Sequence, residues 1–119
     1  MRTPFLHLAN PGNERGDDDR APGAAITLAL CGSWEHSPPC PLAAHHTQPT
    51  REGKTVDLRV VFATEPEYED EVRRRIDGAL RAGTATDPNG VTSYWALRGS
   101  KPGVPSPSER AQALRMSSS

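Results

Sequence analysis

The sequence predicts an α+β fold, in which a small mixed β-sheet of about three strands is covered on one face by one amphipathic helix. Three observations lead to this prediction. Large apolar residues alternate with polar ones over residues 55–64, which is the period of a half-buried strand. Apolar residues then recur at helical spacing over 66–82. A second alternating stretch covers 91–98, directly after a strong turn signal.

The two ends of the chain lack the apolar periodicity that a buried element needs. Residues 1–22 are rich in proline, glycine and charge, and residues 100–119 contain several prolines and end in three serines. Such segments do not bury enough surface to offset the entropy of ordering them. We therefore predict a disordered N-terminal tail over 1–22, one domain over 23–99, and a flexible C-terminal tail over 100–119. Residues 106–116 of that tail are compatible with a short helix.

The first ordered element is expected at residues 26–31, where Ile26, Leu28 and Leu30 occupy every second position. This spacing favours a strand. A short buried helix is the alternative, because alanine and leucine favour helix. The strand is preferred because Gly32 and the prolines after it keep the element short. A long proline-rich loop then covers residues 32–53, since proline lacks the amide donor that a strand ladder needs. Loops of this length are usually functional or disordered.

Residues 55–64 form the clearest strand. Val56, Leu58, Val60 and Phe62 share one face, and the side chains of Asp57 and Arg59 point the other way.

The predicted helix follows this strand at once. Thr64 and Glu67 have the spacing of a capping box, and Pro66 suits the first turn. Gly83 suits the residue after the last turn. Between these limits the apolar stripe consists of Tyr68, Val72, Ile76, Ala79 and Leu80.

The third strand is expected after a turn over 87–90. Val91, Trp95 and Leu97 alternate and would share one face. The helix would join this strand to the 55–64 strand as a right-handed β-α-β unit. The strand at 26–31 would lie between these two strands or at an edge of the sheet.

Charge and hydropathy exclude two classes of partner. The formal net charge is −1 and no section is strongly basic, so nucleic-acid binding is not expected. No apolar run is long enough to cross a bilayer, so no membrane partner is expected. The N-terminus lacks the apolar core of a signal peptide, and we expect a cytoplasmic protein. Two cysteines in that compartment are thiols or metal ligands rather than a disulfide.

One short stretch gathers the residues that could carry chemistry. Residues 31–46 hold both cysteines and three of the four histidines of the chain. Thiolate sulfur and imidazole nitrogen are the ligands that tetrahedral zinc prefers. The candidate ligands are Cys31, His36, Cys40, His45 and His46, with one of the adjacent histidines completing a Cys2His2 set. The spacing matches no standard zinc finger, because it has neither a C-x2-C pair nor a helical H-x3-H.

The other interpretations of these residues remain open. A histidine could activate Cys40 or Cys31 as a nucleophile, although no helix start or oxyanion hole is evident. The three arginines 73–75 fan around a helix and are expected to form an exposed face rather than a phosphate site. We predict a small soluble binding or interaction module with an unidentified protein partner, and zinc is its one candidate cofactor. A small Cys/His enzyme and a metal-free regulatory partner protein are the alternatives.

Overall fold

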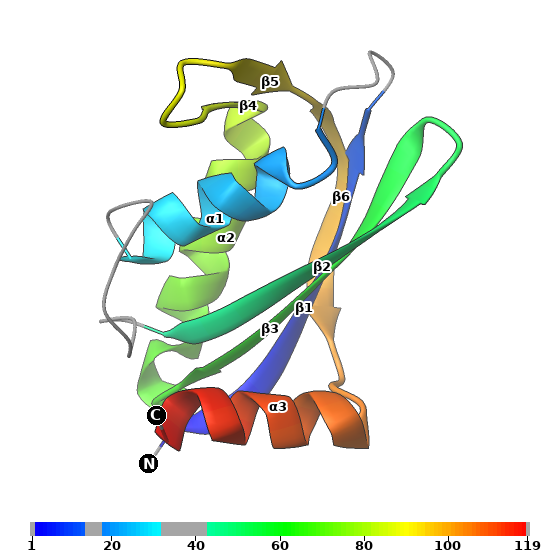
Figure 1. Cartoon of the computed structure of the whole chain (residues 1–119). Helices are drawn as coiled ribbons and strands as arrows, with labels where there is room; N and C mark the ends of the chain where they lie inside the picture. The colour runs from blue at the N-terminus through cyan, green and yellow to red at the C-terminus, as the bar shows by residue number, and fades with distance from the viewer. Residues whose placement is uncertain (1, 14–17, 32–42, 119) are drawn as a thin grey trace.

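The computed structural model of the chain describes residues 2–13, 18–31 and 43–118 (Figure 1). Three α-helices, one 3-10 helix and six strands lie within these residues. In chain order they are β1 (Thr3–Gly12), α1 (Ala21–Cys31), β2 (Ala44–Glu52), β3 (Thr55–Thr64), the 3-10 helix η1 (Pro66–Tyr68), α2 (Glu69–Ala82), β4 (Thr84–Thr86), β5 (Thr92–Tyr94), β6 (Ala96–Gly103) and α3 (Pro107–Ser118).

The main sheet has four strands in the order β2-β3-β1-β6, and every neighbouring pair is antiparallel. β4 and β5 form a separate antiparallel hairpin. The main elements follow the order β-α-β-β-α-β, which is the ferredoxin-like arrangement. The predicted α+β class is confirmed. The predicted detail of three strands, a mixed sheet and one helix is wrong, since β1 separates the parallel strands β3 and β6 and splits the expected β-α-β unit.

The N-terminal residues, predicted to be disordered, contain the central strand β1. This strand pairs with β3 on one side and with β6 on the other. These two partners order it, although its apolar alternation is short. Leu6 and Ala9 are buried on its opposite faces. The turn-like Pro11-Gly12 lies at the end of the strand, beyond a shift in the register with β6. A proline is tolerated at such an irregularity, and its presence does not show that the preceding residues are disordered.

Residues 26–31, predicted to be a strand, belong to helix α1. Ile26 and Leu30 are one helical turn apart, and both are buried against α2 and the sheet. Alanine and leucine around them favour helix. Ile26, Leu28 and Leu30 occupy every second position because this helix is apolar on nearly every side. Leu28 itself is exposed.

The second half of the predicted loop contains the edge strand β2, whereas residues 32–42 lie outside the described part of the chain. β2 pairs with β3 through a tight hairpin at Gly53-Lys54. Gly53 has a positive φ of 63°, which a two-residue hairpin turn uses. Pro49 is accepted because an edge strand leaves alternate amides unpaired.

The predicted strand at 55–64 and the helix after it are confirmed. Val72, Ile76 and Leu80 are the buried residues of α2. The helix ends at Gly83, which has a left-handed φ of 71°. The predicted capping box is wrong, because η1 precedes α2, its N-cap is Glu65, and no side chain caps it.

The predicted strand at 91–98 is two strands of different sheets, β5 and the beginning of β6. Trp95 lies at the crossing and is buried, and Leu97 packs against the main core. Val91 is 61% exposed and does not share their environment.

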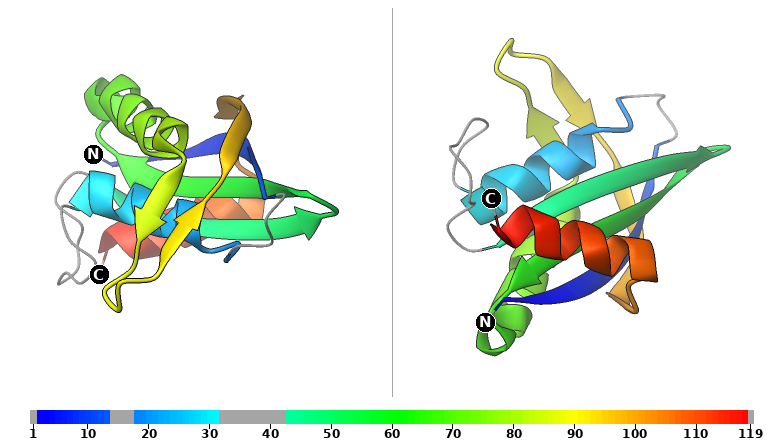
Figure 2. Two further views of the ribbon diagram at one scale, coloured as in Figure 1. Left: turned by 90° about the horizontal axis from the view of Figure 1, so that it is seen from above. Right: turned by 60° about the horizontal axis from the view of Figure 1, so that its bottom comes forward.

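The sheet is covered on both faces. One face packs against α1 and α2 through a core that includes Leu58, Val60 and Phe62. The alternate residues Val61 and Ala63 face a second cluster beneath α3. Figures 1 and 2 show α3 across one end of the sheet, away from α1.

The C-terminal segment, predicted to be a flexible tail, completes β6 and forms the helix α3. Ser106 and Glu109 make the capping box of α3: the Ser106 hydroxyl accepts the Glu109 amide over 3.2 Å, and a Glu109 carboxylate oxygen accepts the Ser106 amide over 2.9 Å. Buried Ala113 and half-buried Met116 attach the helix to the sheet. The short helix that the sequence suggested over 106–116 is therefore present and docked. No helix in the described residues is long and apolar enough to span a membrane.

Candidate functional site

The candidate metal ligands fall into three groups. His45 and His46 are adjacent in β2 and their side chains are described. Cys31 is the last residue of α1, but its side chain is outside the described part of the chain. His36 and Cys40 lie wholly outside the described residues. Among the described residues no three His, Cys, Asp or Glu side chains gather closely enough to hold a metal ion.

The side chain of His45 faces α1. Its Nε2 lies 2.9 Å from the Thr27 hydroxyl, and its Nδ1 lies 3.2 Å from the Ala43 carbonyl oxygen. A carbonyl oxygen only accepts, so Nδ1 carries the proton in this contact. The neutral ring then presents the lone pair of Nε2 to Thr27.

Thr27 relates His45 to the end of α1. The backbone of Cys31, the last residue of α1, is about one turn beyond Thr27. The end of α1 and the start of β2 lie on the same side of the molecule (Figure 1). His45 therefore contacts α1 about one turn before the helix ends.

His46 is exposed and points to the opposite face of β2, because successive side chains alternate across a strand. The two adjacent histidines do not approach one site together. A Cys2His2 set needs only one of these two histidines, and His45 is the one that faces α1.

A second polar cluster surrounds His7, which lies in the N-terminal segment that was predicted to be a tail. His7 of β1 is 4% exposed. Its Nε2 is 2.6 Å from the Ser100 hydroxyl of β6, and Arg73 of α2 donates to its Nδ1 over 3.0 Å. Ser100 also donates a hydrogen bond to the carboxylate of Asp77. No spacing in the sequence marks this cluster, since its hydrogen bonds join residues 23 to 93 positions apart.

The donor and acceptor of each hydrogen bond of the His7 ring can be assigned. Because Arg73 donates to Nδ1, neutral His7 carries its proton on Nε2 and donates it to Ser100. Burial and the nearby Arg73 charge lower the pKa of His7 to about 4, against a smaller opposite effect of Asp77. The ring is therefore neutral at neutral pH and has no free lone pair toward Ser100. This Ser–His contact has the wrong polarity for a nucleophile and its base.

Arg73 connects α2 to β1 through several hydrogen bonds. The prediction that it belongs to an exposed arginine face is wrong. Its side chain is 12% exposed, whereas that of Arg74 is 74% exposed. It donates to Glu69 and to the Leu6 carbonyl oxygen, each over 2.8 Å. Its guanidinium also lies 5.3 Å from the centre of the Phe62 ring, within the range of a cation–π contact.

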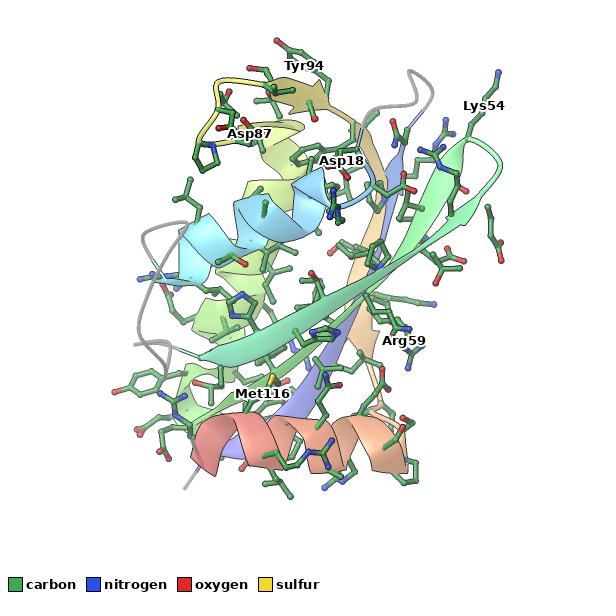
Figure 3. All side chains as sticks on the ribbon, viewed as in Figure 1. Asp18, Lys54, Arg59, Asp87, Tyr94 and Met116 are labelled. Carbon is green, nitrogen blue, oxygen red and sulfur yellow. The ribbon has the colours of Figure 1, made fainter. Side chains whose placement is uncertain are left out.

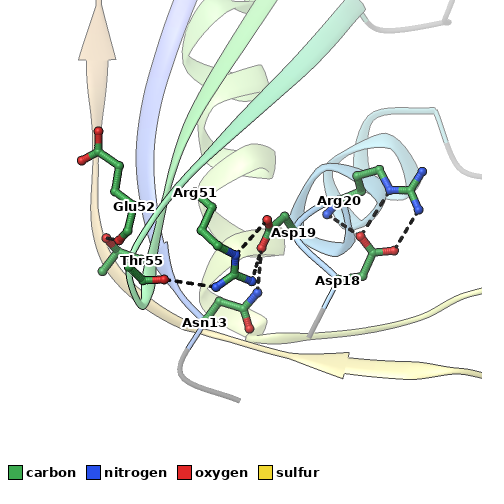
Figure 4. A network of polar contacts seen from close by, with 8 residues as sticks. Asn13, Asp18, Asp19, Arg20, Arg51, Glu52 and Thr55 are labelled. Carbon is green, nitrogen blue, oxygen red and sulfur yellow. Dashed lines mark hydrogen bonds and ion pairs between the residues drawn. The ribbon is translucent and has the colours of Figure 1, made fainter. Parts of the chain in front are cut away.

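A further network joins the start of α1 to the β2-β3 hairpin (Figure 4). Asp19 accepts hydrogen bonds from Arg51 over 2.5 and 3.1 Å and from Asn13 over 2.9 Å. Asn13 is buried, and its amide bonds to the Lys54 carbonyl oxygen over 2.7 Å. Asn13, Asp19 and Arg51 bond to one another or to the backbone of the hairpin, so we assign this network to the fold.

Comparisons with known proteins give no functional assignment. No protein-family model matches the sequence, and no curated protein matches it. One similar solved structure is the NMR structure of a de novo designed protein with a ferredoxin fold. It is 19% identical, the alignment covers 83% of this chain and 87% of the designed one, and the TM-score is 0.44. The strand order alone supports the fold assignment made above.

Proposed function

We propose that the protein is a small binding module in which a structural zinc ion fixes the segment between α1 and β2. Cys31 and Cys40 would bind the ion through sulfur, and His36 and His45 through nitrogen. Four protein ligands complete a tetrahedral shell and leave no open position for a substrate, which is typical of a structural rather than a catalytic zinc.

One observation carries this proposal: the ring of His45 is already arranged as zinc-binding histidines usually are. Such a histidine donates its second ring nitrogen to a carbonyl or carboxylate, which fixes the ring and makes the binding nitrogen more basic. The Nδ1 of His45 makes this contact with Ala43, and Nε2 is turned toward Thr27 of α1, about one turn before the end of that helix. An incoming ion would displace the Thr27 contact, and the single hydroxyl proton of Thr27 would then be donated to the Gly23 carbonyl oxygen, which lies 3.2 Å away.

The test is metal analysis of the full chain, purified without a histidine tag. We expect one zinc per chain and a lower melting temperature after chelation, because an ion that binds the folded state adds to its stability. Cys40→Ser and His45→Ala should each abolish stoichiometric zinc. His46→Ala is the matched control, since it removes an imidazole from the other face of the same strand, and it should keep the zinc.

Two outcomes would contradict the proposal. Metal-free protein with an unchanged melting temperature after chelation would favour the metal-free partner protein. Rapid labelling of Cys40 by iodoacetamide at neutral pH, unaffected by added zinc, would favour the Cys/His enzyme.

A further inference from the structure

The face of the main sheet that carries α3 has a groove beyond the end of that helix. Its volume is about 410 Å³. It spans all four strands of the sheet, and the residues used below line it: Leu8, Asn10, Thr50, Asp57, Arg59 and Lys101. Its size is at the lower end of that of small-molecule sites.

Strand register explains why these residues meet. Leu8 of β1 pairs with Arg59 of β3 on one side and with Lys101 of β6 on the other. The two cationic residues thus flank an apolar one in a single row. Asp57 and Asn10 are two positions further along their strands, and the Asn10 amide donates to the Asp57 carboxylate over 2.6 Å.

Helix α3 holds Arg59, which lines the groove. Glu109 in its first turn accepts two hydrogen bonds from the Arg59 guanidinium, both of 2.8 Å (Arg59 is labelled in Figure 3). These bonds lower the pKa of Glu109 to about 2, and the Ser106 contacts contribute further, so the ion pair persists at neutral pH. Arg59 is therefore fixed, and its charge is balanced.

Two opposite charges remain in the groove. The carboxylate of Asp57 bonds to the neutral amide of Asn10 and makes no ion pair within the described part of the chain. Lys101 is exposed, and its side chain makes no ion pair or hydrogen bond with the residues that the structure describes. An anion alone would be repelled by Asp57, and a cation alone by Lys101. The complementary ligand carries both charges, with a short apolar part over Leu8.

We propose that this groove binds a small zwitterion, namely a free amino acid or a dipeptide. Its ammonium group bonds to Asp57 and its carboxylate to Lys101. Strands are about 4.8 Å apart, so the α-carbons of these two residues are separated by about 10 Å across the sheet and about 7 Å along it. The lysine side chain is long and flexible, so its ammonium group can approach a ligand carboxylate from across the groove. This site is independent of the proposed zinc, because His45 faces the other side of the sheet.

The test is an NMR titration of the isotope-labelled full chain with alanine and with alanyl-alanine. The backbone amides of Leu8, Asn10, Asp57 and Lys101 should shift in a saturable way. N-acetyl-alanyl-alanine lacks the ammonium charge, and alanyl-alanine amide lacks the carboxylate. Each should bind about tenfold more weakly, as expected when one charge-assisted hydrogen bond is lost.

The chain supplies a matched pair of variants, because Lys54 and Lys101 are its two lysines. Lys101→Met should weaken binding of the zwitterion about tenfold. Lys54→Met, at the tip of the β2-β3 hairpin (Figure 3), should leave it unchanged. The proposal is overturned if no saturable shift occurs, if the capped peptides bind as well, or if both lysine variants weaken binding equally.

Discussion

Arg73 of α2 and His7 of β1 form a partly buried hydrogen bond of 3.0 Å in which the guanidinium donates to Nδ1. The contact joins the helix to the central strand, and it also makes the fold depend on a neutral histidine. A protonated ring would place a second positive charge against Arg73 and would lose the acceptor that Arg73 uses. Asp77 is too weak an opposing influence to restore the ordinary pKa of His7.

The first prediction is that acid weakens the fold in a defined pH window. The pKa of His7 is about 4 in the folded chain, against an ordinary value of 6.5. The unfolded state therefore binds a proton first, and the contribution of His7 to stability is complete above about pH 6.5. It should be lost progressively as the pH falls from about 6.5 to about 4. The free energy of unfolding in urea, measured across this range, checks the prediction.

His7→Gln is the control for this window, since glutamine does not titrate there. The variant should show a flatter pH dependence between the same two values. Glu109 acts lower, because its pKa of about 2 lies below the ordinary 4.5, so its contribution is lost only as the pH falls below about 4.5. An unchanged slope in His7→Gln would show that other groups cause the acid sensitivity.

The second prediction separates two neighbouring arginines. Arg73→Met keeps an aliphatic side chain but leaves Glu69, the Leu6 carbonyl oxygen and His7 without their donor. We expect a loss of about 2–4 kcal/mol in the free energy of unfolding, since several buried polar groups lose partners at once. Arg74→Met should change it by less than about 0.5 kcal/mol, because that side chain is exposed. Equal effects on the melting temperature would contradict the assigned role of Arg73.

The third prediction concerns the N-terminal segment. A chain that begins at residue 23 lacks β1, so β3 loses its partner and β6 loses the strand that attaches it to the sheet. We expect this chain to be unfolded, with the narrow amide dispersion of a random coil in its NMR spectrum. A synthetic peptide of residues 1–22 added to it should restore dispersion. A cooperatively folded truncated chain would show that β1 is dispensable.

The sequence predicted those elements whose signals are local. Residues 55–64 and the stripe of Val72, Ile76 and Leu80 bury one face each, and their periodicity shows it directly. β1 was missed because its stability comes from pairing with residues about 50 and 90 positions away. α1 was predicted to be a strand because its residues are apolar on most sides, so no polar face marks the helical period.

The same distinction applies to the candidate sites. The Cys/His segment is local in sequence and was found from composition, and it stays a prediction. The choice between His45 and His46 depends on which face of β2 each side chain occupies, and the sequence alone does not show this. The His7 cluster and the groove beside Lys101 depend on strand order, which no single segment encodes. Ser106 and Glu109 did have the spacing of a capping box, but the low apolar content after them obscured it.

The last prediction compares the glycine that follows α2 with a glycine inside it. Gly83 follows α2 with a φ of 71°, and a β-carbon there would lie 2.8 Å from the Trp95 carbonyl oxygen. That backbone cannot move freely, because the Gly83 carbonyl oxygen accepts the Trp95 amide over 3.0 Å. Gly83→Ala therefore combines left-handed strain with a collision, and it should destabilise the fold by about 1–3 kcal/mol.

Gly78 is the matched position within the same helix. It is exposed, and a β-carbon there would meet nothing within 4 Å. Gly78→Ala should therefore stabilise the protein by about 0.5–1 kcal/mol, because alanine has the higher helix propensity and restricts the unfolded chain. The two substitutions are chemically identical and should shift the melting temperature in opposite directions. Shifts of the same sign would mean that Gly83 does not end α2 in the left-handed conformation.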